Sequence, residues 1–286
     1  MPGRRWPRSV AAVAGGDQRA GLIPAMLKQW RASRGLSQLD LALAAGISAR
    51  HVSFIETGRS APSAEMVLRI GSTLGVPLRQ VNAMLAAAGH DEVFDEPVEL
   101  APPVLEALDF LKSHHEPFPL VVMDHTYTLL DANRAATTLF GLLLDRPPAA
   151  ADGVTGLNLA RLTFDPAGAQ PYLVNFEEVG RQLLWRIQRE VLADPDDGQL
   201  HELLDELLAM PTVADDWREV NLSVPSDPAI VLHLRRDGVD LRFLTTVTMF
   251  QAPQNVAVEQ VRIEQWFPYD EATADMCRSS AGTGAR

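Results

Sequence analysis

The most constraining feature of this chain is a series of short helical segments, separated by glycine, serine and proline, between residues 22 and 90. Within each segment, apolar residues recur at the three- and four-residue spacing of an amphipathic helix. Glycines stand where a helix must end, and serines stand where the next helix needs an oxygen to accept a free backbone N–H. The predicted helices are Leu22–Arg34, Gln38–Ala45, a third from the Ser48 cap to near Thr57, a fourth starting at Pro62 and a fifth starting at Pro77.

The second and third helices are separated by a sharp turn at Gly46, where we expect a positive φ that disfavours a side chain. Two short helices joined in this way, inside a five-helix unit, form the helix-turn-helix pattern. The residues expected to face the core are Leu39, Ala42 and Leu43 in the second helix, and Val52 and Ile55 in the third.

About seventy residues resemble the lambda-repressor-like, or XRE, family of helix-turn-helix transcription regulators, in the segment RGLSQLDLALAAGISARHVSFIETGRSAPSAEMVLRIGSTLGV. The matching motifs are Ser37-Gln38, Ala45-Gly46, Ile55-Glu56-x-Gly58-Arg59 and Pro62-Ser63. The resemblance implies an all-α, five-helix domain over residues 18–90 that binds a double-stranded DNA operator. It also implies that the third helix inserts its N-terminal part into the major groove.

Carried over position by position, the resemblance assigns contacts to the outward residues of the third helix. Arg50 would donate two hydrogen bonds to a guanine, while Ala49 and Phe54 would touch a thymine methyl, and Ser53 lies on the same face. The residues expected to bind phosphates are Gln38, Ser48 and Arg59.

Three residues of this segment leave alternatives open. Phe54 could pack on the neighbouring helix instead of meeting DNA, and His51 could be solvated instead of touching a phosphate. Glu56 would repel a phosphate if it faced DNA, so we expect a capping or intramolecular role for it.

Charge divides the chain into two parts of opposite sign. Residues 1–90 hold 11 Lys+Arg and 4 Asp+Glu, a balance of +7, whereas residues 91–286 hold 14 and 33, a balance of −19. A basic segment joined to an acidic one is typical of a protein that binds phosphates with one end only. Because one such domain has a small DNA interface, we expect a homodimer on paired half-sites.

Composition is that of a globular protein in a reducing compartment. The chain has 286 residues, enough for two domains, and 47% of them are hydrophobic. We expect no membrane span, because no apolar run approaches the roughly 18–20 residues needed. Cys277 is the single cysteine, which excludes an internal disulfide and fits the cytoplasm. Residues 1–17 read as a disordered arm.

After an acidic, proline-containing linker at 91–101, short β-rich runs and helices alternate. A one-sided helix around Leu108 could join the two domains, and two hairpins are predicted, with turns at Asp124–Tyr127 and Asp237-Gly238. The predicted strands are Leu120–Asp124, Thr128–Ala132, Ala229–Arg236, Val239–Phe250 and Val256–Phe267. The predicted helices are Asn133–Leu143, Asn158–Phe164, Tyr172–Ala193 and Leu200–Met210, and residues 275–286 are a tail. This is the α+β layout of a PAS-like domain over 102–274, an antiparallel sheet of five strands with a helical insert.

The same region resembles the ligand-binding domain of the MmyB-like regulators. The matching pieces are HEPFPLVVMD, LLDANRAATTLFG, LNLARLTFDP and RFLTTVTMFQAPQNVAVEQVRIEQWFP. The sequence departs from the family at His125-Thr126-Tyr127, where a basic residue and then a tryptophan are expected. We expect the hairpin to survive that change.

The resemblance implies a pocket between sheet and helices for a small hydrophobic ligand, a fatty acid or similar acyl chain being one candidate. The candidate lining residues are Phe164, Tyr172, Phe176, Leu183, Trp185, His233, Phe243 and Val247, each of which could instead belong to a filled core. Asn133, Asn175 and His233 are candidate polar anchors. Alternatively, the second domain only dimerises or docks another protein.

Catalytic chemistry is not indicated by any motif. The sequence has neither a phosphate-binding glycine loop nor a Gly-x-Ser-x-Gly elbow, so we predict no enzyme activity and no cofactor. The adjacent His114 and His115 would diverge on a helix, and Asp194–Gly198 lacks the closing glutamate of a calcium loop. We therefore predict no metal site.

Overall fold

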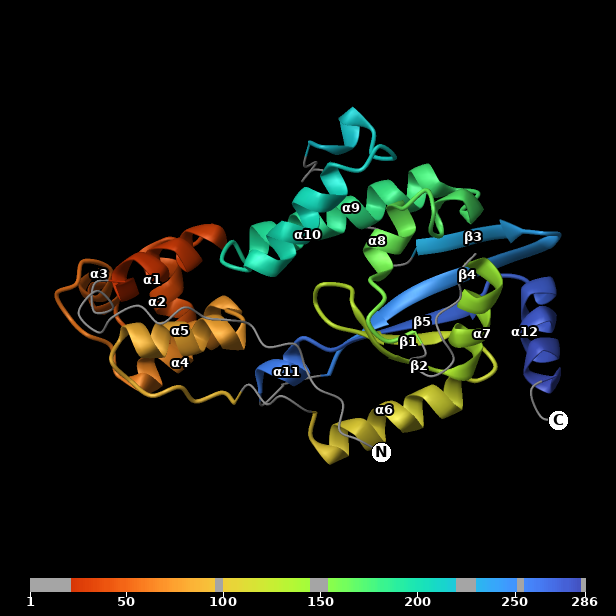
Figure 1. Cartoon of the computed structure of the whole chain (residues 1–286). Helices are drawn as coiled ribbons and strands as arrows, with labels where there is room; N and C mark the ends of the chain where they lie inside the picture. Colours follow the sequence, from red (N-terminus) through yellow and green to blue (C-terminus); the bar gives the residue numbers. More distant parts are fainter. Residues whose placement is uncertain (1–21, 96–99, 145–153, 220–229, 251–254, 284–286) are drawn as a thin grey trace. The chain divides into compact units, whose positions relative to one another are not determined.

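The computed structural model describes residues 22–95, 100–144, 154–219, 230–250 and 255–283 (Figure 1). Contacts divide the chain into two compact units. The first unit consists of Met1–Leu100 together with Gln251–Glu259, and the second of Ala101–Phe250 together with Gln260–Arg286. The predicted N-terminal arm lies outside the described residues. None of the described helices is both long and apolar enough to span a membrane.

The five helices predicted for the first unit are confirmed: α1 Leu22–Ser33, α2 Gln38–Ala45, α3 Ala49–Glu56, α4 Ala64–Leu74 and α5 Leu78–Ala87. Serines begin three of them, because the side chains of Ser37, Ser48 and Ser63 each accept a backbone N–H of the first turn. Gly46 ends α2 at a φ of 66°, as the predicted turn requires.

The inward face predicted for α2 is partly wrong. Leu41, Ala42 and Ala45 are buried, whereas Leu39 and Leu43 are 58% and 72% exposed. Six of the eight residues of α2 are leucine or alanine and they lie on all sides of the helix, so periodicity alone cannot choose the buried face. Packing against α3 and α4 makes the choice. The predicted Val52 and Ile55 of α3 are fully buried.

The second unit is built on one antiparallel sheet of five described strands in the order β2-β1-β5-β4-β3. The strands are β1 Leu120–Met123, β2 Leu129–Ala132, β3 Ile230–Arg236, β4 Val239–Thr248 and β5 Arg262–Pro268. Both predicted hairpins are present, β1 with β2 and β3 with β4. Thr245 of β4 stands opposite Trp266 of β5, so these side chains share a face of the sheet.

The main helices of this unit are α6 Pro102–His115, α7 Arg134–Leu143, α8 Leu159–Phe164, α9 Phe176–Ala193, α10 Gly198–Leu208 and α12 Glu271–Thr283. Helices α6, α7, α9 and α12 contact strands of the sheet, and α8 and α10 pack on α9. The face of β4 and β5 that carries Leu241, Phe243 and Trp266 packs on α7. A larger core joins β1, α7, α8, α9 and α10. The two-domain fold with a PAS-like second domain is therefore as predicted.

Two elements near the C-terminus differ from prediction. The run Val256–Phe267 is not one strand, because Val256–Glu259 forms a helical turn, α11, and β5 starts at Arg262. The side chain of Asn255 accepts the N–H of Val258 and so begins the helical turn, in which Val256, Ala257 and Val258 are buried. The predicted tail, 275–286, mostly lies in α12, so the predicted domain limit at 274 falls inside a helix.

Candidate DNA-reading helix and ligand pocket

Helix α3 is anchored in the core on one face and is open to solvent on the other. Val52 and Ile55 anchor it in the core, while Arg50 is exposed and Ser53 and Phe54 are half-buried. The guanidinium carbons of Arg50 and Arg59 lie 5.0 Å and 6.0 Å from the centre of the Phe54 ring. The Phe54 ring thus makes cation–π contacts with both arginines, so two cations lie at one edge of the helix.

Glu56 ties α3 to the two preceding helices. Its carboxylate accepts hydrogen bonds from Arg31 Nε at 2.6 Å, Arg31 Nη2 at 3.0 Å and Gln38 Nε2 at 2.7 Å. Burial alone would raise the pKa of Glu56, but these hydrogen bonds outweigh burial and hold the pKa below its usual value. The predicted intramolecular role of Glu56 is confirmed.

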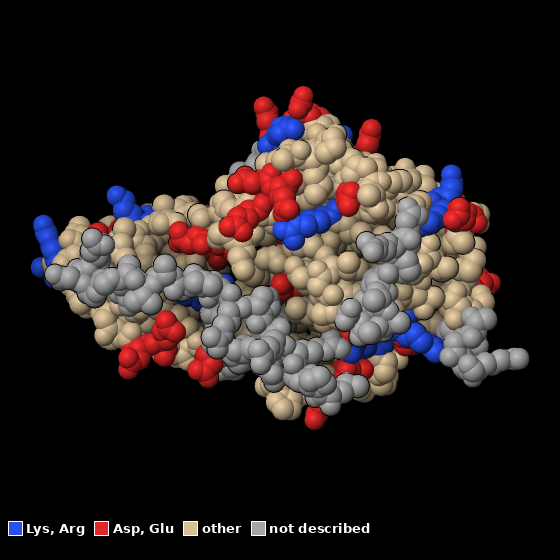
Figure 2. Space-filling view, in the orientation of Figure 1, with Lys and Arg blue, Asp and Glu red and all other residues tan. Residues whose placement is uncertain are grey.

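Three other residues predicted to contact DNA make contacts within the protein. One amide N–H of Gln38 is used by Glu56, and Ser48 Oγ accepts the N–H of His51 as the helix cap. Ala49 is partly buried against the core of the first unit. In the first unit, Lys and Arg side chains project at the end that carries α3, and Arg50 and Arg59 are exposed there (Figures 1 and 2).

The second unit contains a largely apolar pocket with about 720 Å³ of empty space, a volume that includes open solvent at its mouth. Its walls come from α7, α8 and α9 on one side and from β3, β4 and β5 on the other. The apolar lining residues include Phe140, Leu143, Leu159, Leu162, Leu183, Ile230 and Leu232. An apolar cavity with a few polar groups is the usual form of a small-molecule site.

The polar side chains of this lining include Arg186 of α9, and Glu264 and Trp266 of β5. Burial raises the pKa of Glu264, against the opposing effects of the Arg186 charge and the Trp266 indole. Trp266 is 4% exposed, and its Nε1 makes no hydrogen bond of normal geometry within the described residues, to Glu264 or to any other group.

A charged network lies beside the pocket. The hydroxyl of the lining residue Tyr127 donates to Glu190 Oε2 at 3.0 Å, and Arg262 Nη1 contacts both carboxylate oxygens of Glu190 at 3.0 Å. Burial and then the charge of Glu190 raise the pKa of the Tyr127 hydroxyl. Through Glu190, Tyr127 thus links the pocket wall to Arg262 at the start of β5.

The predicted ligand residues are only partly brought together. Leu183 lines the pocket, whereas Phe164 and Phe176 pack in the core. The ring of Tyr172 lies under the Arg236 guanidinium, and Trp185 lines neither described pocket. Val247 is 40% exposed and also lies outside both pockets. Alternation along a strand or helix identifies a buried face, but not which part of it is left unfilled.

All three predicted polar anchors are engaged within the protein. Asn133 caps α7 and also bonds Leu120 and Phe118, and Asn175 bonds the backbone of Val231 and His233. The ring of His233 contacts Asp240 at 2.8 Å. These residues hold the walls in place, and none of them is among the residues that line this pocket.

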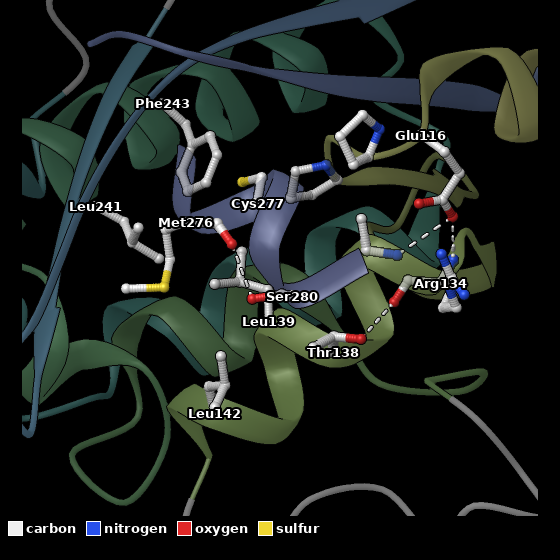
Figure 3. Close-up of a pocket in the computed structure, with 13 residues that line it drawn as sticks. Glu116, Arg134, Thr138, Leu139, Leu142, Leu241, Phe243, Met276, Cys277 and Ser280 are labelled. Atoms are coloured by element: carbon white, nitrogen blue, oxygen red, sulfur yellow. Dashed lines mark hydrogen bonds between the residues drawn. The ribbon is translucent and has the colours of Figure 1, made fainter. Parts of the chain in front are cut away.

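A second, smaller pocket of about 430 Å³ contains the predicted residue Phe243 (Figure 3). Leu241 and Phe243 of β4 face Leu139 of α7 and Cys277 of α12 across it. Burial raises the pKa of the Cys277 thiol to about 11. The cysteine therefore behaves as a small apolar group at neutral pH.

Sequence reasoning missed the polar lining residues Arg186, Glu264 and Trp266. One signal was present: Glu264 and Trp266 stand two apart in the predicted strand, so they share a face, and an acidic residue beside apolar neighbours there is unusual. Arg186 carried no such signal, because arginines are common on helices of this length.

Comparisons with known proteins agree with this arrangement. A model of the MmyB-like transcription regulator ligand binding domain matches residues 104–279, and a helix-turn-helix model matches residues 27–81. No curated protein matches the chain.

Among solved structures, one described as an RNA-binding light-oxygen-voltage receptor is 16% identical, with a TM-score of 0.27. The match covers 93% of this chain and 62% of that one, so this chain spans less than two thirds of its length. This TM-score is too low to infer a shared fold.

The described residues contain no group of three or more His, Cys, Asp or Glu side chains that could hold a metal ion. The two family models cover the helix-turn-helix and the domain that contains the apolar pocket. The chain is a DNA-binding transcription regulator with a C-terminal ligand-binding domain, and it belongs to the family of MmyB-like transcription regulators.

Proposed function

We propose that this protein is a ligand-responsive regulator whose second unit binds a small, hydrophobic, fatty-acyl-like molecule and thereby changes operator affinity. The observation that carries the proposal is the apolar pocket between α7–α9 and β3–β5. A cavity of this lining would be costly to leave empty in a core that only had to support a fold, because unfilled apolar volume lowers stability.

Base reading is assigned to the outer face of α3. Arg50 is exposed at the first turn of the helix, where a guanidinium can donate two hydrogen bonds to a guanine in the major groove. Ser53 and Phe54 follow on the same side. Arg59, just after the helix, suits a phosphate contact, and a homodimer would place two such helices on paired half-sites.

Covalent connectivity supports communication between the two functions. Thr245 of β4 and Glu264 of β5 line the pocket, and the segment between these strands belongs to the first unit. In that segment, Val256 N–H donates to Asp95 O at 3.0 Å, and Glu259 Oε2 accepts the N–H of Leu78 at 2.9 Å, at the start of α5. A shift of the β4–β5 pair would therefore pull on the DNA-binding unit.

The test is a titration of delipidated full-length protein against an operator selected from random DNA, followed by fluorescence anisotropy, with and without saturating dodecanoic acid. We expect operator affinity to change about 5- to 150-fold, the usual range of allosteric coupling. Unchanged affinity with proven ligand binding would overturn the sensor role. It would favour a second unit that only dimerises, which sedimentation of the same samples would reveal.

A further inference from the structure

The smaller pocket of the second unit contains a carboxylate with one unpaired oxygen. The pocket has about 430 Å³ of empty space, a volume that includes open solvent, between α7, α12 and β4. Glu116 lies at one end of it, where its Oε1 accepts the backbone N–H groups of Arg134 and Ala135 at 2.8 Å and 3.3 Å. The other oxygen, Oε2, is buried and has no hydrogen-bond partner within the described residues. Figure 3 shows this oxygen on the side of the carboxylate that faces the rest of the pocket.

The neighbouring polar groups are directed elsewhere. The ring of His115 contacts the backbone oxygen of Trp266 at 3.2 Å, and burial lowers the pKa of His115, so this histidine is neutral at neutral pH. The hydroxyls of Thr138 and Ser280 each donate to a backbone carbonyl of their own helix at 2.9 Å. Arg134 is exposed, so solvent screens the charge of its guanidinium. A donor for the buried oxygen therefore comes from solvent or from a ligand.

The remaining walls of this pocket favour an apolar ligand over water. Leu241 and Phe243 of β4 face Leu139 of α7 across it. Leu142 and Met276, which also line the pocket, are 47% and 39% exposed. Water in the pocket would pair the carboxylate but leave this apolar surface wet, whereas a molecule with an apolar body would cover it.

The charge of the site selects the head group of such a molecule. The N-terminus of α7 favours the ionised form of Glu116, which can only accept hydrogen bonds. An ammonium group carries only donors and a positive charge, so it matches this acceptor. Residues 91–286, with 14 Lys+Arg against 33 Asp+Glu, also attract cations.

We propose that this smaller pocket is a second small-molecule site, which binds a hydrophobic primary amine through its ammonium group at Glu116. The alkyl part of the amine lies between Leu139 of α7 and Phe243 of β4. This site shares no lining residue with the pocket between α7–α9 and β3–β5. It therefore stands or falls independently of the acyl ligand of the proposed function.

The single cysteine of the chain provides a local test, because Cys277 lines this pocket and a bound molecule would shield its thiol. The full-length protein is treated with methyl methanethiosulfonate at about pH 9, where an alkylamine is still largely protonated, and modification is followed by mass spectrometry. Hexylamine, hexanol and hexanoate are compared as protecting probes of one chain length. We expect hexylamine to protect Cys277 at about tenfold lower concentration than hexanol, because its hydrogen bond is charge-assisted, and hexanoate to protect least.

Glu116→Gln tests the carboxylate itself. The amide oxygen can still accept the N–H groups at the start of α7, but the charge is gone, so hexylamine should lose its advantage while protection by hexanol stays within about threefold. Glu271→Gln removes an acid of the same unit from the first turn of α12, outside the pocket, and should keep the preference for the amine.

Three results would overturn the proposal. Equal protection of wild-type Cys277 by all three probes would show an apolar cleft that does not select a head group. Failure of every probe to protect the thiol would leave only water in the pocket. A preference for hexylamine that persists in Glu116→Gln would place the ammonium elsewhere. The first two results need no variant to fold.

Discussion

The two units of this regulator treat buried charge in opposite ways. In the first, the Arg31 guanidinium, the Glu56 carboxylate and the Gln38 amide satisfy one another across three helices. In the second, Arg186, Glu264 and Trp266 line a largely apolar cavity. A closed network favours one geometry of the helices, whereas an apolar cavity leaves room for a small molecule. Under the proposed function, this difference separates the unit that must stay rigid to read DNA from the unit that responds to a ligand.

Removing Glu56 should have the largest effect, because it breaks the closed network. In Glu56→Ala, Arg31 retains only its bond to Leu36 O, at 2.7 Å, and its charge stays largely buried. We expect the free energy of unfolding of the first unit to fall by about 3–5 kcal/mol, as for other buried pairs that lose one partner. Urea unfolding, followed by amide exchange in α1–α5, measures this change.

The pH dependence of stability and an exposed ion pair provide controls for the Glu56→Ala result. Since the pKa of Glu56 is lowered by folding, its contribution is present above its ordinary pKa of 4.5 and is lost as pH falls through the folded pKa. The stability difference between wild type and Glu56→Ala should therefore shrink in strong acid. Glu65→Ala breaks an exposed pair with Arg69 and should change stability by about 0.5 kcal/mol or less. Equal effects of the two substitutions would mean that the Arg31 network is not stabilising.

The surface arginines of the first unit extend the comparison, because the partner proposed for them is operator DNA. Arg50 and Arg59 have no ion pair among the described residues and share the Phe54 ring. We expect Arg50→Ala to weaken operator binding by about 1–3 kcal/mol and to relax preference at one base position. Arg59→Ala should weaken binding evenly on all sequences and reduce the salt slope by about 1. Binding to a panel of single-base operator variants separates these outcomes, and an even loss for Arg50→Ala would reassign it to phosphate.

The first unit can be predicted from the sequence more closely than the pocket of the second unit. Caps such as Ser37, Ser48 and Ser63 act within four residues, so the sequence predicts the helices of the reader closely. The buried face of α2 depends on its neighbours, and the turn at α11 depends on burial against α5, so both were predicted wrongly. The pocket is the least predictable, because Arg186 and Glu264 lie 78 positions apart and only the fold brings them to one cavity.

The smallest effect on stability is expected at Glu259, in the segment that connects the pocket strands β4 and β5. Glu259 places a carboxylate at the N-terminus of α5, where it accepts the N–H of Leu78. Glu259→Gln keeps the shape but removes the charge that favours this helix end, so stability of the first unit should fall by only about 0.3–1 kcal/mol. Because the same residue ends the segment between β4 and β5, the change of operator affinity on adding dodecanoic acid should shrink as well. Glu271→Gln, which removes an acid from the first turn of α12 in the second unit, should leave that response intact. A full ligand response in Glu259→Gln, together with the small loss of stability, would show that communication between pocket and reader does not pass through α11.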